Sequence, residues 1–282
     1  MKKTSFLPCA VVFILIGLML AIPAPEADAA GTVGGGTPVS CTEAAFDTAL
    51  IGGGAVDFNC GGATTITFTS TKSISVATTI SGGNVITLSG GSAVRLFNVT
   101  GGGLTLNNIS LVNGRDSVAN PGAAAINASA SVTINESTIS GHQTTNGGCP
   151  AIVMSGNTLT IIRSTITGNV NGAAAAGQAI CANNTATLNV DSSTITGNTG
   201  GAIRNSGTAT LVHCTIAGNS PTAGSTSGII NFGDSANTTL INTIVSNNSG
   251  GIGQCQNVLG GSSSMEEGTS SSLTRLAEAP SR

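Results

Sequence analysis

The stretch Ser164-Thr165-Ile166-Thr167-Gly168-Asn169 is repeated, residue for residue, as Ser193-Thr194-Ile195-Thr196-Gly197-Asn198. Weaker copies occur on both sides, each with an aliphatic residue at the third position, which we call the anchor. The anchors are Leu111, Ile139, Ile166, Ile195, Ile216 and Ile244. They are spaced 28, 27, 29, 21 and 28 residues apart. A period in this range is typical of a solenoid in which similar units stack on one another.

Each copy contains three pieces of strand length. Ahead of the anchor stands an alternating segment such as Leu159-Thr160-Ile161, and further upstream a short pair such as Ala179-Ile180. The alternating segment ends five positions before the anchor in every copy except the last, where Leu240 is only four ahead. Alternation with a period of two places aliphatic side chains on one face and Thr, Ser or Asn on the other. The sequence therefore predicts an all-β fold, a right-handed single-stranded parallel β-helix with three short strands per coil.

Stacking supplies what a single coil lacks, because one coil alone would leave an aliphatic face exposed and two rows of backbone groups unpaired. Equivalent side chains should then form columns, and we expect the six anchors to be the stacked core. A column of exposed threonines is expected beside them, consisting of Thr138, Thr165, Thr194, Thr215 and Thr243, with Ser140, Thr167 and Thr196 in a second column. A ladder of turn asparagines is expected three residues after the anchors, at Asn169, Asn198, Asn219 and Asn247. Gly114 and His142 hold the ladder position in the earlier copies.

The chain divides into four expected segments. Residues 1–30 have the Lys2-Lys3 start, the apolar run from Ala10 to Ile22 and the small residues before Gly31 that are typical of a cleaved secretory signal peptide. That run is shorter than the ~20 residues that cross a bilayer, so no membrane span is expected after cleavage. Residues 31–60 should form an N-terminal cap with a short helix begun by Thr42, residues 61–260 the β-helix, and residues 261–282 a polar, disordered tail.

Six of the seven cysteines follow the signal segment. In an exported protein, Cys41 and Cys60, which flank the expected cap helix, are the natural disulfide pair. The pairing of the other four remains open, and a bond between neighbouring coils through Cys149 and Cys181 is one possibility. The other two are Cys214 and Cys255. Because the chain has no Cys-x-x-Cys motif, buried thiols or disulfides are favoured over a metal site, and we expect neither a metal nor a cofactor.

The amino-acid composition limits the classes of partner that the chain can bind. Only 7% of the residues are charged while 40% are hydrophobic, which favours a folded chain over a disordered one. The nine Lys and Arg residues are scattered and there is neither Trp nor Tyr, so the platform on which nucleic-acid bases stack is missing. We expect no nucleic-acid partner.

Two motifs carry a resemblance to a known group. Gly200-Gly201-Ala202-Ile203 and the repeated Ile-x-x-Asn of the anchors resemble the GGAI and FxxN motifs of polymorphic outer-membrane-protein repeats. More broadly, the chain from Cys41 to Gly260 is similar to bacterial secreted proteins with pectin-lyase-like, right-handed parallel β-helix repeats. The resemblance implies a secreted or cell-surface location outside the bacterial cytoplasm, and it raises polysaccharide lyase or hydrolase chemistry, for which the fold is best known.

The coils contain few charged side chains that could act in catalysis. The carboxylates Asp116, Glu136 and Asp191 occupy different positions relative to their anchors, so they are not expected to converge. Arg115 with Asp116 is the best candidate pair, while His142 and His213 fit turn and surface positions. No catalytic residue is therefore assigned.

The expected function is that of a non-catalytic exported surface or extracellular protein for adhesion or display. Its partner would be a cell-surface or extracellular polysaccharide or protein. A carbohydrate-active enzyme with a degenerate site is the alternative, and an ice-binding solenoid is a lesser one, because flat paired Thr columns resemble those of ice-binding solenoids.

Overall fold

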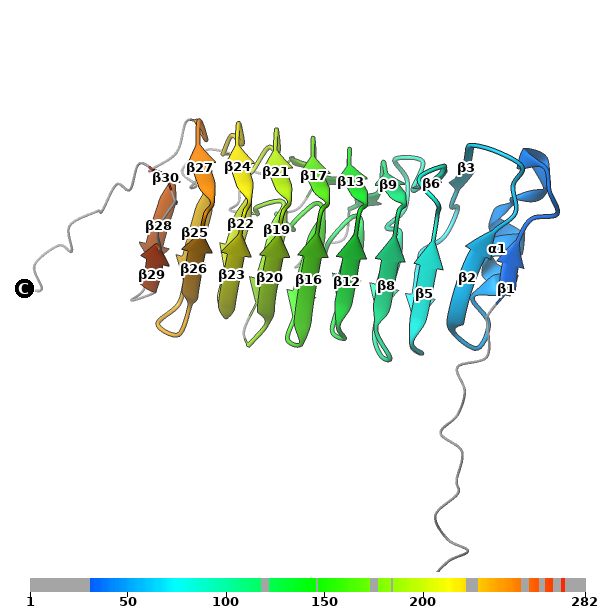
Figure 1. The fold of residues 1–282 in the computed structure, drawn as a ribbon, viewed down its shortest axis with the longest axis horizontal. Coiled ribbons are helices and arrows are strands. Elements are labelled where there is room, and N and C mark those ends of the chain that lie inside the picture. Colours follow the sequence, from blue (N-terminus) through cyan, green and yellow to red (C-terminus); the bar gives the residue numbers. More distant parts are fainter. Residues whose placement is uncertain are drawn as a thin grey trace, which may run out of the picture.

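The computed structural model describes residues 31–117, 122–145, 147–172, 177–183, 185–221, 228–249, 254–258, 262–265 and 270–271. The expected signal peptide lies outside these residues. The described chain forms a right-handed parallel β-solenoid, a rod of coils stacked along its long axis with the helix α1 at the N-terminal end (Figure 1). The fold class expected from the repeats is confirmed.

Three parallel sheets run along the rod, and each complete coil adds one strand to each of them. The first, sheet A, has ten strands: β1 (Gly31–Val33), β2 (Gly54–Phe58), β5 (Thr78–Ser81), β8 (Leu104–Asn107), β12 (Val132–Asn135), β16 (Thr158–Ile162), β20 (Thr187–Asp191), β23 (Thr208–Val212), β26 (Asn237–Ile241) and β29 (Ser262–Met265). From β8 to β26 its strands are the alternating segments that the sequence places before the anchors.

Sheet B carries the anchors and has nine strands: β3 (Thr64–Thr67), β6 (Ile86–Ser89), β9 (Ser110–Val112), β13 (Thr138–Ser140), β17 (Thr165–Thr167), β21 (Thr194–Thr196), β24 (Thr215–Ala217), β27 (Ile244–Ser246) and β30 (Ser270–Ser271). Sheet C has eight: β4 (Lys72–Ile74), β7 (Phe97–Val99), β11 (Ile126–Ala128), β15 (Ile152–Ser155), β19 (Ile180–Asn183), β22 (Ile203–Asn205), β25 (Ile229–Phe232) and β28 (Cys255–Val258). A small sheet D adds β10 (Arg115–Asp116), β14 (Gln143–Thr144) and β18 (Val170–Asn171).

The core is a set of aliphatic columns inside the coils. Leu111, Ile139, Ile166, Ile195 and Ile216 pair in register from β9 to β24, and each is fully buried. Equivalent columns form on sheets A and C. Each buried aliphatic side chain contributes about 1.5 to 3 kcal/mol of transfer free energy, so many thin coils together replace one large core.

The last anchor differs from the expectation. Ile216 pairs with Val245, which is fully buried, whereas Ile244 pairs with Thr215 and is 45% exposed. The assignment of Ile244 to the core column was wrong. Val245 lies five residues after Leu240, which restores the spacing that holds in every other copy, and alternation along the strand then turns Ile244 outward.

The N-terminal end is closed by α1 (Glu43–Ala49), which begins where the Thr42 side chain accepts a hydrogen bond from the Ala45 amide at 3.1 Å. A short 3₁₀ turn, η1 (Pro38–Ser40), precedes it. Phe46 of the helix is fully buried against the Phe68 ring, with the two ring centroids 5.1 Å apart. As expected, this helix shields the first coil from water, since an uncovered coil end would expose apolar side chains.

An ion-pair cluster fastens the helix to the first coil. Lys72 begins the inward column of sheet C and is 4% exposed, and its Nζ lies 2.6 Å from Glu43 and 2.7 Å from Asp47 of α1. Burial disfavours the charged form of Glu43, but hydrogen bonds from Lys72 and Thr69 outweigh it and lower the pKa of Glu43 to about 2. The buried ammonium group is thereby compensated.

The expected segment boundaries shift slightly at both ends. Strand β2 lies within the segment predicted as a cap, yet it is already a rung of sheet A. Strands β29 and β30 lie within the segment predicted as a tail, where they pair with β26 and β27. The stacking therefore continues as far as Ser271, and residues 272–282 lie outside the described part.

Candidate functional site

A buried asparagine ladder stiffens the corner that follows sheet B. In Asn169 and its counterparts the side-chain amide donates to a carbonyl of the preceding coil and to the Oδ1 of the next ladder asparagine, as from Asn169 to Asn198 at 2.9 Å. The members are Asn169, Asn198, Asn219 and Asn248. Asn248, not the predicted Asn247, is the last, because the anchor of that coil is Val245. Asn247 is exposed instead.

Other side chains terminate the ladder. At its C-terminal end, Gln254 Oε1 accepts hydrogen bonds from the backbone and side-chain amides of Asn248. At the other end stands His142, with no solvent-exposed surface. Its Nδ1 accepts from the Gly114 amide at 2.8 Å, so its Nε2 bears the proton and donates to the Leu111 carbonyl at 3.0 Å. Burial lowers the pKa of His142 to about 4, although the bond to Leu111 opposes this shift. His142 therefore takes the place of an asparagine in the ladder. Both of its ring nitrogens bond to the backbone, so it is not positioned to act as a catalytic base.

The outward face of sheet B has the expected hydroxyl columns over most of its length. Thr138, Thr165, Thr194 and Thr215 pair in register and are half-buried, and Ser140, Thr167 and Thr196 form the second column. The fifth predicted member was wrong: Thr243 is fully buried, and Ile244 takes the outward place.

The reason lies in a buried polar position two residues before each anchor. Ser137, Ser164 and Ser193 occupy it, and each hydroxyl accepts a hydrogen bond from a backbone amide of the preceding coil. Thr243 fills the same place and accepts from the Cys214 amide at 3.2 Å. Because the Thr243 hydroxyl forms this hydrogen bond inside the coil, it is not part of the outward hydroxyl column.

A second corner, between sheets A and B, was missed by sequence reasoning. Its single corner residue has a positive φ in each coil, and the members are Asn108, Glu136, Arg163, Ser192, His213 and Asn242. All of them lie three residues before an anchor, which is the signal that could have found them. Side chains meet along this ridge: Arg163 donates to Glu136 at 2.6 Å and 2.9 Å, and Asn108 donates to the other oxygen of Glu136. These bonds lower the pKa of Glu136, with Arg163 the main cause.

Beside this ridge, the outward face of sheet A is hollowed. The depression extends over β16, β20 and β23, is open to solvent and has a volume of about 300 Å³. Its lining includes Thr160, Ile162, Asn189, Asp191, Val212 and His213. His213 Nδ1 lies 3.7 Å from Asp191 Oδ1, and Ser192 donates to the same oxygen at 2.8 Å. Asp191 and His213, which the sequence suggested only as isolated surface groups, are therefore neighbours.

The predicted pair of Arg115 with Asp116 is not what the structure has. Asp116 is 5% exposed and bonds to Arg95 at 2.8 Å, and Arg95 also donates to the Ala123 carbonyl. This pair closes the base of the segment that connects β10 to β11, and we call such a connecting segment an excursion. Two later excursions are closed from the equivalent position, where Thr144 and Asn171 donate to glycine carbonyls at 3.0 Å. We therefore assign Asp116 a structural role.

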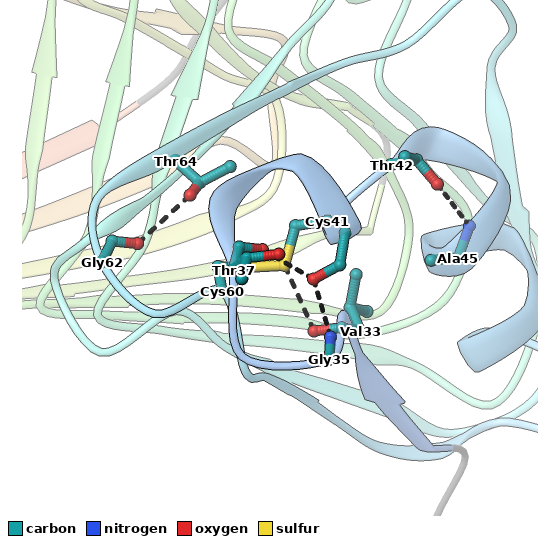
Figure 2. Close-up of a disulfide and its surroundings, with 10 residues drawn as sticks. Val33, Gly35, Thr37, Cys41, Thr42, Ala45, Cys60, Gly62 and Thr64 are labelled. Atoms are coloured by element: carbon teal, nitrogen blue, oxygen red, sulfur yellow. Dashed lines mark hydrogen bonds between the residues drawn. A yellow bond between two sulfur atoms is a disulfide. The ribbon is translucent and has the colours of Figure 1, made fainter.

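Two cysteine pairs lie at bonding distance. Cys41 and Cys60 join the segment before α1 to the end of β2, with their Cα atoms 5.6 Å apart (Figure 2), as expected. Cys149 and Cys181 join neighbouring coils outside sheet C, with Cα atoms 5.9 Å apart. Cys214 and Cys255 are free and buried, and burial raises the pKa of both thiols, that of Cys255 to about 12. An oxidising compartment suits such a protein.

Comparison of the chain with protein-family models, curated proteins and solved structures found no match. The class defined here, a parallel β-solenoid of the three-strand type, thus rests on the strand register itself. Among the described residues, no group of three His, Cys, Asp or Glu side chains could hold a metal ion, and no helix is long and apolar enough to cross a membrane.

Proposed function

We propose that the chain is a non-catalytic exported surface protein that serves adhesion or display, with an extracellular or cell-surface polysaccharide or protein as its partner. The observation that carries this proposal is the repetition of uncharged hydrogen-bonding groups on two long faces. On sheet A the outward column is Thr79, Thr105, Thr133, Thr160, Asn189, Thr210 and Thr239, and sheet B has the hydroxyl columns described above.

Such faces suit a long, uncharged partner. The rungs recur about every 4.8 Å, so a chain lying along the rod can make many individually weak contacts at once. The asparagine ladder and the disulfides fix the rungs before any partner arrives, which reduces the ordering cost of association. Export is supported by the two cysteine pairs and by the signal-like segment of the sequence.

Adhesion is tested with beads coated with the exported chain, presented to bacterial cells and to immobilised neutral polysaccharides under flow. Retention above that of beads coated with an unrelated protein of similar charge is expected. Retention equal to that of this control on every surface would contradict the proposal.

Ice binding is a second candidate because two neighbouring strands, β17 and β21, each present a Thr-Ile-Thr motif in register. The array is short, since Ala217 and then Ile244 interrupt it. Measuring thermal hysteresis of the protein, with Thr194→Lys as the disrupted control, separates this candidate from adhesion. Its complete absence at high protein concentration would eliminate ice binding.

A further inference from the structure

The outward face of sheet A changes its chemistry at one strand, β20. In the threonine column, Asn189 stands between Thr160 and Thr210. In the next column, Asp191 stands between Ile162 and Val212. Since the two residues are two positions apart on one strand, their side chains leave the same face about 6 to 7 Å apart. An amide and a carboxylate thus lie together in the middle of the hollow.

We propose that this hollow binds one sugar ring of a neutral glycan. The inference deepens the proposed adhesive function and rests on it. It names the ligand as an uncharged pyranose unit, and it places Asn189 and Asp191 as the hydrogen-bonding groups and Ile162 and Val212 as the apolar contact.

Asn189 and Asp191 have hydrogen-bonding atoms that a ligand could use. Within the described residues, the Asn189 side chain makes no hydrogen bond, whereas Asn135 and Asn107 on the same face are joined by one of 2.9 Å. Ser192 occupies one oxygen of Asp191, and the imidazole of His213 lies nearby. An exposed amide can simply be hydrated, but here it adjoins a second free acceptor within a concave surface. Sugar hydroxyls both donate and accept, so they can satisfy an amide and a carboxylate together.

The apolar side chains match the other part of a sugar. Ile162 and Val212 are half-buried on either side of Asp191 and present aliphatic surface to the hollow. A pyranose ring has carbon-bound hydrogens on its faces and hydroxyls around its edge. The volume of about 300 Å³ is at the lower limit of the ~300 to 1,000 Å³ found for small-molecule pockets, which suits one ring rather than a longer segment.

The negative charge of Asp191 determines which glycans the hollow can accept. The Asp191 carboxylate is 54% exposed, and Arg163, the cation next to Ile162 in the chain, is bonded to Glu136 on the ridge. A uronate entering the hollow would meet the Asp191 carboxylate, whose neighbour among the described basic side chains is the His213 imidazole and not a Lys or Arg. Like charges in close contact disfavour binding. We therefore expect neutral oligosaccharides to be preferred over acidic ones.

The test is titration of the ¹⁵N-labelled exported chain with neutral hexasaccharides of glucose, mannose and xylose, and with hexagalacturonate as the acidic probe. At least one neutral probe should shift the Asn189 side-chain amide signal, with a Kd in the range of about 0.1 to 10 mM. Asn189→Thr, which installs the residue of the neighbouring rungs, should weaken binding about tenfold, and Val212→Thr should also weaken it.

Matched controls separate the site from a general surface effect. Asn237→Thr changes an exposed asparagine on β26 in a column otherwise rich in threonine, and Asp234→Asn removes an exposed carboxylate elsewhere. Both controls should bind like the wild type. The inference is overturned if no neutral probe binds up to about 10 mM, if hexagalacturonate binds more tightly, or if Asn189→Thr behaves like the controls.

The bead assay distinguishes this failure from that of the adhesive function. Adhesion that persists unchanged in Asn189→Thr would refute the hollow as the site and leave adhesion standing. Loss of adhesion in the wild type would remove the broader proposal as well.

Discussion

Protonation of His142 should make the rod sensitive to mild acid. In the unfolded chain this imidazole titrates near 6.5, whereas in the fold its pKa is about 4, because burial disfavours the charged ring. Protonation of Nδ1 would also break the hydrogen bond that it accepts from the Gly114 amide. The depressed pKa means that its contribution to stability is complete above pH 6.5 and is lost as the pH falls towards 4. Since a tenfold change in proton binding is worth about 1.4 kcal/mol, the full loss is about 3 kcal/mol, and most of it should appear by pH 4.5.

The assay is urea unfolding of the exported chain at several pH values between 7 and 4.5. This window lies above the range in which Glu43, with its pKa of about 2, loses its contribution. His142→Asn installs the ladder residue, whose amide can accept from Gly114 and donate to Leu111 without a titrating group. Its free energy of unfolding should fall by less than about 0.5 kcal/mol over the same window.

The exposed His213 provides the control, and His213→Asn should retain the wild-type pH dependence. If His142→Asn loses stability with falling pH as steeply as the wild type, the buried imidazole is not the cause and the reasoning fails.

Three further changes test the packing. Val245→Thr, which puts a hydroxyl into the core, should lower the free energy of unfolding by about 2 kcal/mol, while Ile244→Thr should change it by less than about 0.5; the reverse order would contradict the register of the last coils. Glu43→Gln should cost about 2 kcal/mol, because Lys72 then keeps only the half-exposed Asp47 carboxylate as its charged partner, and adding Lys72→Met should recover part of this loss in thermal denaturation. Cys149→Ala should cost about 4 kcal/mol under oxidising conditions and almost nothing in reductant, because the closed loop is long; equal costs in both would argue against the bond.

The fold was predictable because the sequence pattern of one coil recurs in each of the following coils. Alternation and spacing identify the strands, and a column predicted from one copy is checked by the next. The single slip at Ile244 arose because Thr243-Ile244 imitates the Ser-Thr-Ile of other copies, so a local match outweighed the spacing from Leu240. The register of this coil follows instead from the buried polar position two residues before the anchor, which Thr243 fills with its hydroxyl.

The hollow on sheet A was harder to foresee. Asn189 and Asp191 are ordinary residues on an exposed strand, and only the lateral neighbours Ile162 and Val212, which lie 29 and 21 residues from Asp191 in the chain, make their surroundings distinctive. The partner of Asp116 was mispredicted for the same reason: Arg95, which lies 21 residues earlier in the chain, takes the place expected for Arg115. Contacts between coils depend on which rung lies above which, and the unequal loops between strands obscure this in the linear chain.

The closed bases of the excursions have a consequence for how such a chain can vary. Where Thr144 bonds to Gly148, and Asn171 to Gly177, the exit and re-entry points of the loop are held together by the loop's own ends. The length and composition of what lies between them can change without altering the rise or phase of the rod. These are natural insertion points, at which new recognition segments can be gained or grafted while the supporting architecture stays intact.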